Sequence, residues 1–90
     1  MEKMNTRTEM YAADLYVLLQ RELRRRQSPQ CQACYVQLPF RVDRDDADSP
    51  NWEVVLPANC RYACRDIIED LVGEFGQLYE LSAETDRDRA

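Results

Sequence analysis

The 90-residue chain has room for one domain with a single hydrophobic core. Its 17 Asp and Glu residues against 12 Lys and Arg give a formal net charge of −5, which opposes long-range attraction to nucleic acid. The absence of histidine removes the commonest general base, and two glycines make no glycine-rich phosphate loop. We therefore expect no enzyme activity.

The sequence predicts neither a signal peptide nor a membrane span. The start MEKMNTRTEM lacks a charged region followed by an apolar one, and no apolar run is long enough to cross a bilayer. We therefore expect a cytoplasmic protein without membrane contact. In a reducing cytoplasm, paired cysteines are more often metal ligands or redox groups than structural disulfides.

A first helix is predicted over about residues 7–27, after frayed residues 1–5. Thr6 and Glu9 have the spacing of a capping box, and Pro29 ends the helix. Its apolar residues form two adjacent rows at helical spacing. The rows are Tyr11, Leu15 and Leu18, and Ala12, Tyr16, Leu19 and Leu23.

The run LYVLL at residues 15–19 gives this helix more apolar surface than packing on one side requires. One side is expected to face the core. The other is a candidate contact surface for a protein partner or a second copy of the chain, through Leu15, Tyr16, Leu18 and Leu19. Alternatively, the rest of the domain covers both sides.

An arginine cluster follows in the last turns of this helix, where cations complement the negative end of the helix dipole. The cluster is Arg21, Arg24, Arg25 and Arg26. Together with Arg41 and Arg44 it could bind the phosphates of a nucleic acid, which makes a nucleic-acid-binding regulator an alternative function. A solvated helix end is preferred because the whole chain is acidic.

The middle of the chain predicts a β-hairpin. Val36, Leu38, Phe40 and Val42 alternate with the period of a half-buried strand, and Pro39 on the other face indicates an edge strand. The acidic stretch 43–51 is a loop. WEVVLP at residues 52–57 is the returning strand.

A second helix follows, with Asn59 as its predicted cap. Its apolar stripe is Ile67, Ile68, Leu71, Val72, Phe75, Leu78 and Tyr79. Gly73 and Gly76 indicate either a kink or the close approach of another backbone, for which the first helix is a candidate. Residues 82–90 are predicted to be a disordered tail, which leaves residues 6–81 as one domain.

The four cysteines form two tight pairs, one on each side of the hairpin. Cys31 and Cys34 fit a turn that points two sulfurs the same way, and Cys60 and Cys64 would share one face of a helix. The hairpin would bring the pairs together. We therefore predict one structural Zn²⁺ ion bound by all four. Two alternatives stay open: a thiol redox switch or disulfide chemistry, and simple packing of free cysteines.

With these cysteines, the chain over about residues 29–80 resembles the treble-clef group of zinc fingers in the order of its elements and the placement of its ligands. The resemblance implies a zinc knuckle, a β-hairpin and a helix whose first turn supplies the last two ligands. The predicted fold class is therefore a small zinc-stabilised α+β domain in the order helix, knuckle, hairpin, helix.

Two further arginines, Arg61 and Arg65, fall in the first turns of the predicted second helix, where the helix dipole disfavours cations. Zinc bound by four thiolates carries a net charge of −2, which these arginines would offset. They could equally be surface residues paired with nearby carboxylates. The preferred function is a non-enzymatic zinc-binding module that acts through protein–protein contact or self-association, and metal removal should unfold it.

Overall fold

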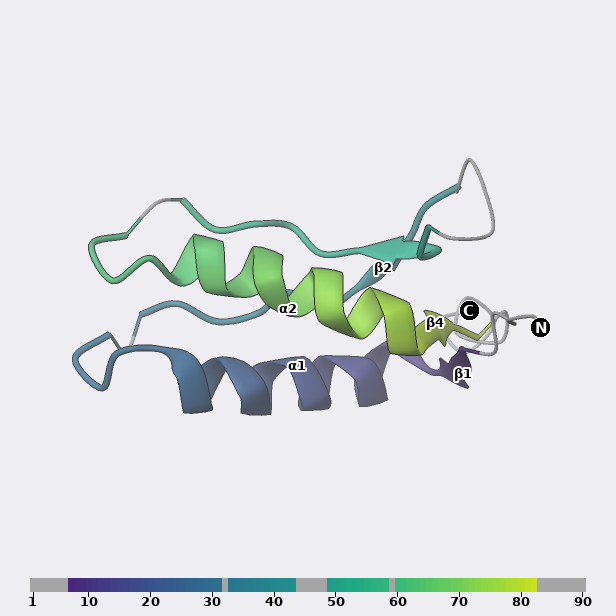
Figure 1. The fold of residues 1–90 in the computed structure, drawn as a ribbon, viewed down its shortest axis with the longest axis horizontal. Helices are drawn as coiled ribbons and strands as arrows, with labels where there is room; N and C mark the ends of the chain where they lie inside the picture. The colour runs from purple at the N-terminus through teal and green to yellow at the C-terminus, as the bar shows by residue number, and fades with distance from the viewer. Residues whose placement is uncertain (1–6, 32, 44–48, 59, 83–90) are drawn as a thin grey trace.

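Two helices form the long body of the molecule (Figure 1). One small sheet is formed between them in the chain, and the strands of the other precede the first helix and follow the second. The computed structural model describes residues 7–31, 33–43, 49–58 and 60–82. These residues form two helices and two two-stranded sheets, which is the predicted α+β class. The elements are β1 Thr8–Met10, α1 Ala12–Arg26, β2 Phe40–Arg41, β3 Trp52–Glu53, α2 Cys64–Leu78 and β4 Tyr79–Leu81.

The helices α1 and α2 pack side by side and run in opposite directions (Figure 1). Their apolar stripes meet the hairpin segments in one core. Its buried residues are Ala12, Leu15, Leu19, Leu23, Val36, Trp52, Val54, Ile68, Leu71 and Leu81. Both predicted stripes thus supply the core, except that Tyr11 and Leu78 are exposed. No helix in the described part of the chain has the length and apolar character needed to span a membrane.

The N-terminal part of the first helix prediction is wrong. Residues Thr8–Met10 form the strand β1, which pairs in parallel with β4, and α1 begins only at Ala12. Tyr11 is the N-cap and makes no side-chain capping bond, so Glu9 belongs to no capping box; Thr6 lies outside the described residues. Pairing with β4 satisfies backbone groups that a longer helix would have used.

The LYVLL run is only partly covered from within the chain. Leu15 and Leu19 are 0% and 1% exposed in the core, and Tyr16 packs against it. Leu18 is half-buried and Val17 is exposed. Leu15 and Leu19 therefore cannot present their side chains to a partner while the fold is intact.

The predicted hairpin is present but short. β2 and β3 pair antiparallel with Phe40 opposite Glu53 and Arg41 opposite Trp52. The predicted alternation is wrong before this pair, since Pro39 is buried while Leu38 and Phe40 are exposed. Pro39 has no N–H to give to a ladder, and the backbone before it is irregular, so the two-residue period does not apply there.

Hydrogen bonds fix the returning arm of the hairpin to β4. The side chain of buried Asn51 donates from Nδ2 to the Leu81 carbonyl at 3.2 Å and accepts from the Leu81 N–H at 2.9 Å. The indole Nε1 of Trp52 donates to the Tyr79 carbonyl at 3.0 Å. Nearby, Arg41 Nη2 donates to the Ser82 carbonyl at 2.7 Å. These hydrogen bonds hold the hairpin to β4, the strand that follows α2.

The two glycines of α2 have different surroundings. A Cβ atom on Gly76 would lie 3.0 Å from the Cγ of Pro50, whereas one on Gly73 would meet nothing within 4 Å. A close approach is therefore found at Gly76, but by a side chain rather than by the predicted backbone. The neighbour, however, is the ring of Pro50 on the hairpin arm and not the first helix.

The second helix begins later than predicted. Ala63, in the left-handed conformation with φ 60°, is the N-cap of α2, and Cys64 is its first residue. Asn59 lies outside the described residues, as do the predicted frayed N-terminus and the tail from residue 83 onward.

Candidate metal centre

Both cysteine pairs lie at the same end of the helix pair. Because α1 and α2 run in opposite directions, the chain leaving α1 and the chain entering α2 meet at one end of the molecule (Figure 1). After α1, Cys31 ends a turn in which its N–H donates to the Ser28 carbonyl at 2.9 Å, and Cys34 follows three residues later. Cys60 lies in the turn before α2, and Cys64 opens that helix.

The four Sγ atoms all lie within 4.8 Å of one another. The Sγ atoms of Cys31 and Cys64 are 3.4 Å apart. Sulfurs at about 2.3 Å from a tetrahedral metal ion are about 3.8 Å apart, so this spacing suits one ion at the centre of the cluster. Cys31 and Cys64 are buried, Cys34 and Cys60 are half-buried, and all four thiols are free. The four cysteines could therefore hold a metal ion.

The first cysteine of each pair is stabilised as a thiolate by the turn that follows it. The Cys64 N–H donates to the Sγ of Cys60 at 3.4 Å, and a second backbone bond comes from Tyr62; together they lower the pKa of Cys60 to about 7. Backbone bonds from Ala33 and then from Cys34 likewise contribute to lowering the pKa of Cys31.

This arrangement corrects the prediction that Cys60 and Cys64 share a helical face. Cys60 precedes α2, and its sulfur is instead turned toward the backbone N–H that opens the helix. The sulfurs of Cys60 and Cys64 still lie close together, because the chain between them forms a turn in which the Ala63 N–H donates to the Cys60 carbonyl at 3.1 Å.

The second cysteine of each pair has the opposite tendency. Burial, followed by the neighbouring thiols, raises the pKa of Cys34 to about 12 and also raises the pKa of Cys64. Four thiolates this close would repel one another strongly in a site shielded from water. A divalent cation among them would offset that repulsion, and its ligands would then be deprotonated together.

Gln27 is a site residue that the sequence analysis missed. Its Nε2 donates to the Sγ of Cys64 at 3.5 Å, and the residue is only 7% exposed. Gln27 is the C-cap of α1 and follows the buried residues Leu19 and Leu23 at intervals of four, so continuing the helical period by one residue could have placed it inward. An amide donor beside a metal-binding sulfur orients it and stabilises its negative charge.

Arg61 and Arg65 lie beside the cluster in the chain but differ in position. Arg61 is exposed in the turn before α2, rather than in the first turn of the helix, and Arg65 is half-buried within that turn. Across residues 7–31, 33–43, 49–58 and 60–82, no hydrogen bond or ion pair of either guanidinium is found. Their role in offsetting thiolate charge stays a prediction.

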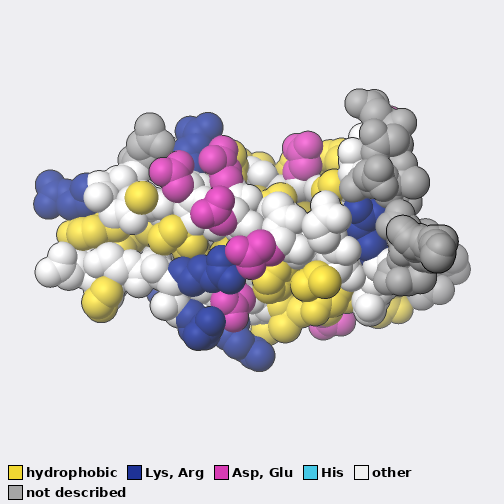
Figure 2. All heavy atoms as spheres, in the orientation of Figure 1, with side chains coloured by type: hydrophobic (Ala, Val, Ile, Leu, Met, Phe, Trp, Pro, Cys, Tyr) yellow, Lys and Arg dark blue, Asp and Glu magenta, His cyan; other side chains and the backbone are white. Residues whose placement is uncertain are grey.

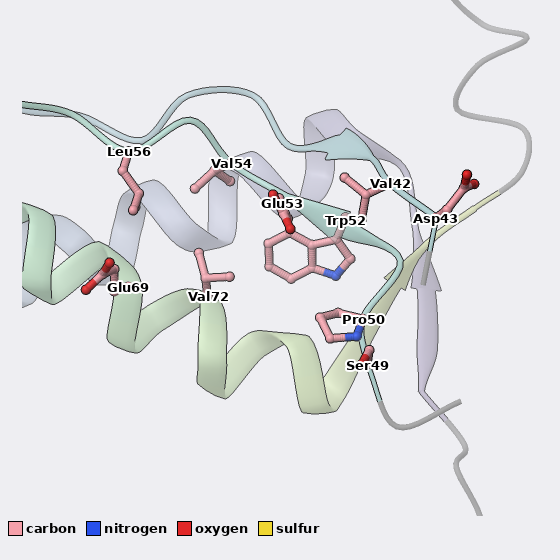
Figure 3. A pocket seen from close by; sticks show the side chains of 10 residues that line it. All are labelled: Val42, Asp43, Ser49, Pro50, Trp52, Glu53, Val54, Leu56, Glu69 and Val72. Atoms are coloured by element: carbon pink, nitrogen blue, oxygen red, sulfur yellow. The ribbon is translucent and has the colours of Figure 1, made fainter. Parts of the chain in front are cut away.

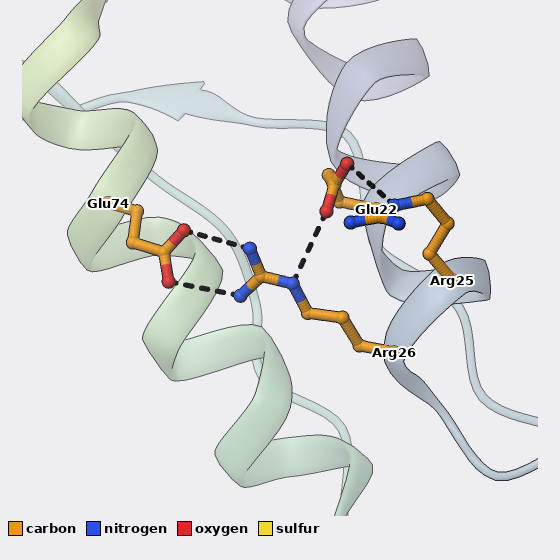
Figure 4. A network of polar contacts seen from close by, with 4 residues as sticks. All are labelled: Glu22, Arg25, Arg26 and Glu74. Atoms are coloured by element: carbon orange, nitrogen blue, oxygen red, sulfur yellow. Dashed lines mark hydrogen bonds and ion pairs between the residues drawn. The ribbon is translucent and has the colours of Figure 1, made fainter.

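The arginine cluster on α1 is divided between paired and solvent-facing side chains. Arg25 pairs with Glu22 at 3.1 Å (Figure 4). Arg26 also pairs with Glu22, at 3.3 Å, and donates two hydrogen bonds, at 2.9 and 3.0 Å, to the carboxylate of Glu74 on α2. Hydrogen bonds from these arginines lower the pKa of both carboxyl groups. Arg21 and Arg24 are exposed, and no carboxylate pairs with them in the part of the chain that the structure describes.

Family models, curated proteins and solved structures were compared with the chain, and none matches it. The interpretation of the cysteine cluster therefore rests on its own geometry: a small α+β domain in which four sulfurs converge to form a possible metal-binding site.

Proposed function

We propose that this protein is a zinc-stabilised module without enzyme activity that acts through contact with another protein or with a second copy of itself. The observation that carries the proposal is the convergence of four free cysteine sulfurs within 4.8 Å. Four sulfurs at that spacing fit a single ion, and two of the ligands, Cys31 and Cys64, are buried as structural ligands usually are.

Zinc is the metal that this ligand set favours. Soft thiolates select zinc or iron–sulfur clusters over the hard cations magnesium and calcium, and zinc is tetrahedral in its structural sites. The cysteine spacings do not match the usual runs of cluster-binding proteins. Four thiolates close the coordination shell and leave no position for a water molecule or substrate, which supports a structural rather than a catalytic ion.

The treble-clef resemblance is part of the proposal. In its favour, a turn with Cys31 and Cys34, the β2–β3 hairpin and the helix α2 follow one another in the order that the group requires. Backbone N–H groups of residues that follow Cys31 and Cys60 in the chain donate to their sulfurs, as a zinc knuckle would require. The additional helix α1 supplies Gln27 to the cluster.

A role in protein contact is favoured by the surface. Several large apolar side chains are exposed on the segment that leads into β2, namely Tyr35, Leu38 and Phe40. Val17 on α1 is also exposed, whereas Leu15 and Leu19 are not. A contact through α1 would therefore use Val17 and Leu18 rather than the buried half of the run LYVLL.

Native mass spectrometry of protein purified without chelator tests the metal. We expect one zinc ion per chain, and X-ray absorption should give four sulfur ligands at about 2.3 Å. Protein that is folded and free of metal would contradict the proposal. Gln27→Met, which keeps the size of the side chain but not the donor, should weaken zinc binding by about 10-fold. Gln37→Met, at an exposed position away from the cluster, is the matched control.

A further inference from the structure

A groove separates the returning arm of the hairpin from α2, and no part of the proposed metal site lies in it (Figure 3). It has a volume of about 560 Å³. Six of its lining residues are apolar, and three carry carboxylates. The lining is Val42, Asp43, Ser49, Pro50, Trp52, Glu53, Val54, Leu56, Glu69 and Val72.

The apolar part of the groove has the length and form of an extended chain. Trp52, Val54 and Leu56 alternate along one arm, and Val72 faces them from α2 (Figure 3). The distance from Trp52 to Leu56 along an extended arm is about 13 Å, which equals about four residues of an extended peptide. Leu56 and Val72 are only half-buried, so apolar area is still available for a ligand to cover.

The charged residues that line the groove are all acidic. Asp43, Glu53 and Glu69 are exposed and come from three separate segments: the end of the first hairpin arm, β3 and α2. Neither lysine nor arginine is among the residues that line it. Further acidic side chains lie over α2 on the same face of the molecule, with Lys and Arg side chains beside them (Figure 2). The acidic lining of the groove itself disfavours phosphates and attracts a cationic group held next to an apolar one.

We propose that this groove binds a short extended segment of a partner protein in which lysine or arginine alternates with aliphatic residues. The aliphatic side chains would cover Leu56 and Val72, and the basic ones would reach Glu53 and Glu69. This proposal deepens the protein-contact part of the proposed function and rests on it, and it gives the partner a chemical class. It requires the folded domain but not the identity of the metal.

Trp52 lines the groove but is fully buried, so titration calorimetry, which needs no reporter side chain, measures occupation of the groove. The probe is the acetylated peptide Leu-Lys-Val-Arg-Leu, titrated into the metal-loaded full chain at low and high salt. We expect saturable binding that weakens with salt. The matched peptide Leu-Glu-Val-Glu-Leu should not bind.

Variants decide whether the carboxylates recognise the peptide. The double variant Glu53→Gln with Glu69→Gln should weaken binding by about 10-fold. Asp70→Asn, also an exposed carboxylate on α2 and next to Glu69 in sequence but outside the lining, should leave it unchanged.

Several results would overturn the proposal. They are no binding, equal loss in Asp70→Asn, equal binding of the acidic peptide, and equally tight binding of spermine, which has the charge without a peptide backbone. A second copy of the chain would be the occupant instead if sedimentation showed a dimer that the double variant dissolves. Metal content is measured on the same samples. If the folded, metal-loaded protein does not bind the peptide, only the groove proposal is contradicted. If the protein is folded without metal, only the zinc proposal is contradicted.

Discussion

The two ends of the helix pair are closed by different chemistry. At the strand end, Asn51 exchanges two hydrogen bonds with Leu81, and Trp52 donates to the Tyr79 carbonyl. These are neutral groups of fixed protonation, and each finds its partner within the chain. At the cysteine end, four ionisable sulfurs face one another, and their neighbours supply backbone N–H groups and the single amide of Gln27.

The strand end is held by hydrogen bonds within the chain, whereas the cysteine end would need a metal ion from outside it. The hydrogen bonds of Asn51 and Trp52 at the strand end are made within the chain and involve no group that titrates near neutral pH. The cysteine end concentrates negative charge once its thiols ionise, and a cation is what would stabilise it. We therefore expect an asymmetry: loss of the metal should unfold the whole domain, whereas loss of hydrogen bonds at the strand end should leave zinc binding intact.

The largest effect is expected from breaking the cysteine end. Cys64→Ser removes a fully buried sulfur that contacts Cys31, Gln27 and the start of α2. Structural zinc contributes about 10–16 kcal/mol in zinc-finger peptides, which is as large as the whole stability of a typical domain. We expect loss of zinc and of cooperative unfolding, measured by metal analysis and by circular dichroism during heating.

Chelation provides the control for this variant. A strong chelator should unfold the wild-type chain, and added zinc should restore it, whereas added zinc should not rescue Cys64→Ser. Cooperative unfolding of Cys64→Ser at the wild-type temperature would contradict the role given to the cysteine end.

The next effect is expected from breaking the strand end. Asn51→Ala leaves the buried N–H and carbonyl of Leu81 without partners, which should cost about 2–4 kcal/mol of the free energy of unfolding. Urea denaturation of zinc-loaded protein measures the loss, with Gln77→Ala, at an exposed position on α2, as the control. Zinc content should stay at one ion per chain. A loss of zinc in Asn51→Ala would show that the two ends are not independent.

The cysteine end was easier to predict from the sequence than the strand end. The pairs at Cys31 and Cys34 and at Cys60 and Cys64 are local patterns, and a hairpin between them is enough to bring them together. The strands β1 and β4 are three residues each and lie almost at opposite ends of the chain. Neither has a period long enough to recognise, and only the packing of α1 on α2 brings them side by side.

Within the elements, the burial of helix residues was predictable, but the helix starts and the face of the hairpin arm were not. Leu15, Leu19 and Leu23 follow the helical period and are buried as it requires. Pro39 is buried against the alternation because the backbone before β2 is irregular. Ala63 caps α2 through its backbone conformation alone, without a side chain that a capping rule could detect.

A smaller effect on stability is expected to separate the two glycines of α2, of which only Gly76 contacts the hairpin arm. Gly73→Ala should stabilise the domain by up to about 1 kcal/mol, because alanine is the better helix former and its methyl group meets open space. Gly76→Ala has the same helix gain but forces its Cβ to within 3.0 Å of Pro50, at a typical cost of about 1–3 kcal/mol.

Thermal unfolding of the two zinc-loaded glycine variants makes the comparison, since each serves as the control for the other. We expect a higher midpoint for Gly73→Ala than for the wild-type chain and a lower one for Gly76→Ala. Equal shifts in the two variants would mean that Pro50 does not press on α2.

The smallest effect is expected between the two ends, where Arg26 connects α1 to Glu74 of α2 on the surface (Figure 4). Both side chains are substantially exposed, so water and salt screen the pair and holding both side chains in place opposes it. In a double-mutant cycle with Arg26→Gln and Glu74→Gln, the coupling measured by urea denaturation should be favourable, smaller than the difference between the glycine variants, and lost at high salt. Arg25→Gln with Glu74→Gln is the matched cycle, because Arg25 pairs with Glu22 on its own helix. A coupling between Arg26 and Glu74 that persists at high salt, or one as large as the effect of Asn51→Ala, would contradict the small, screened contribution expected of this pair.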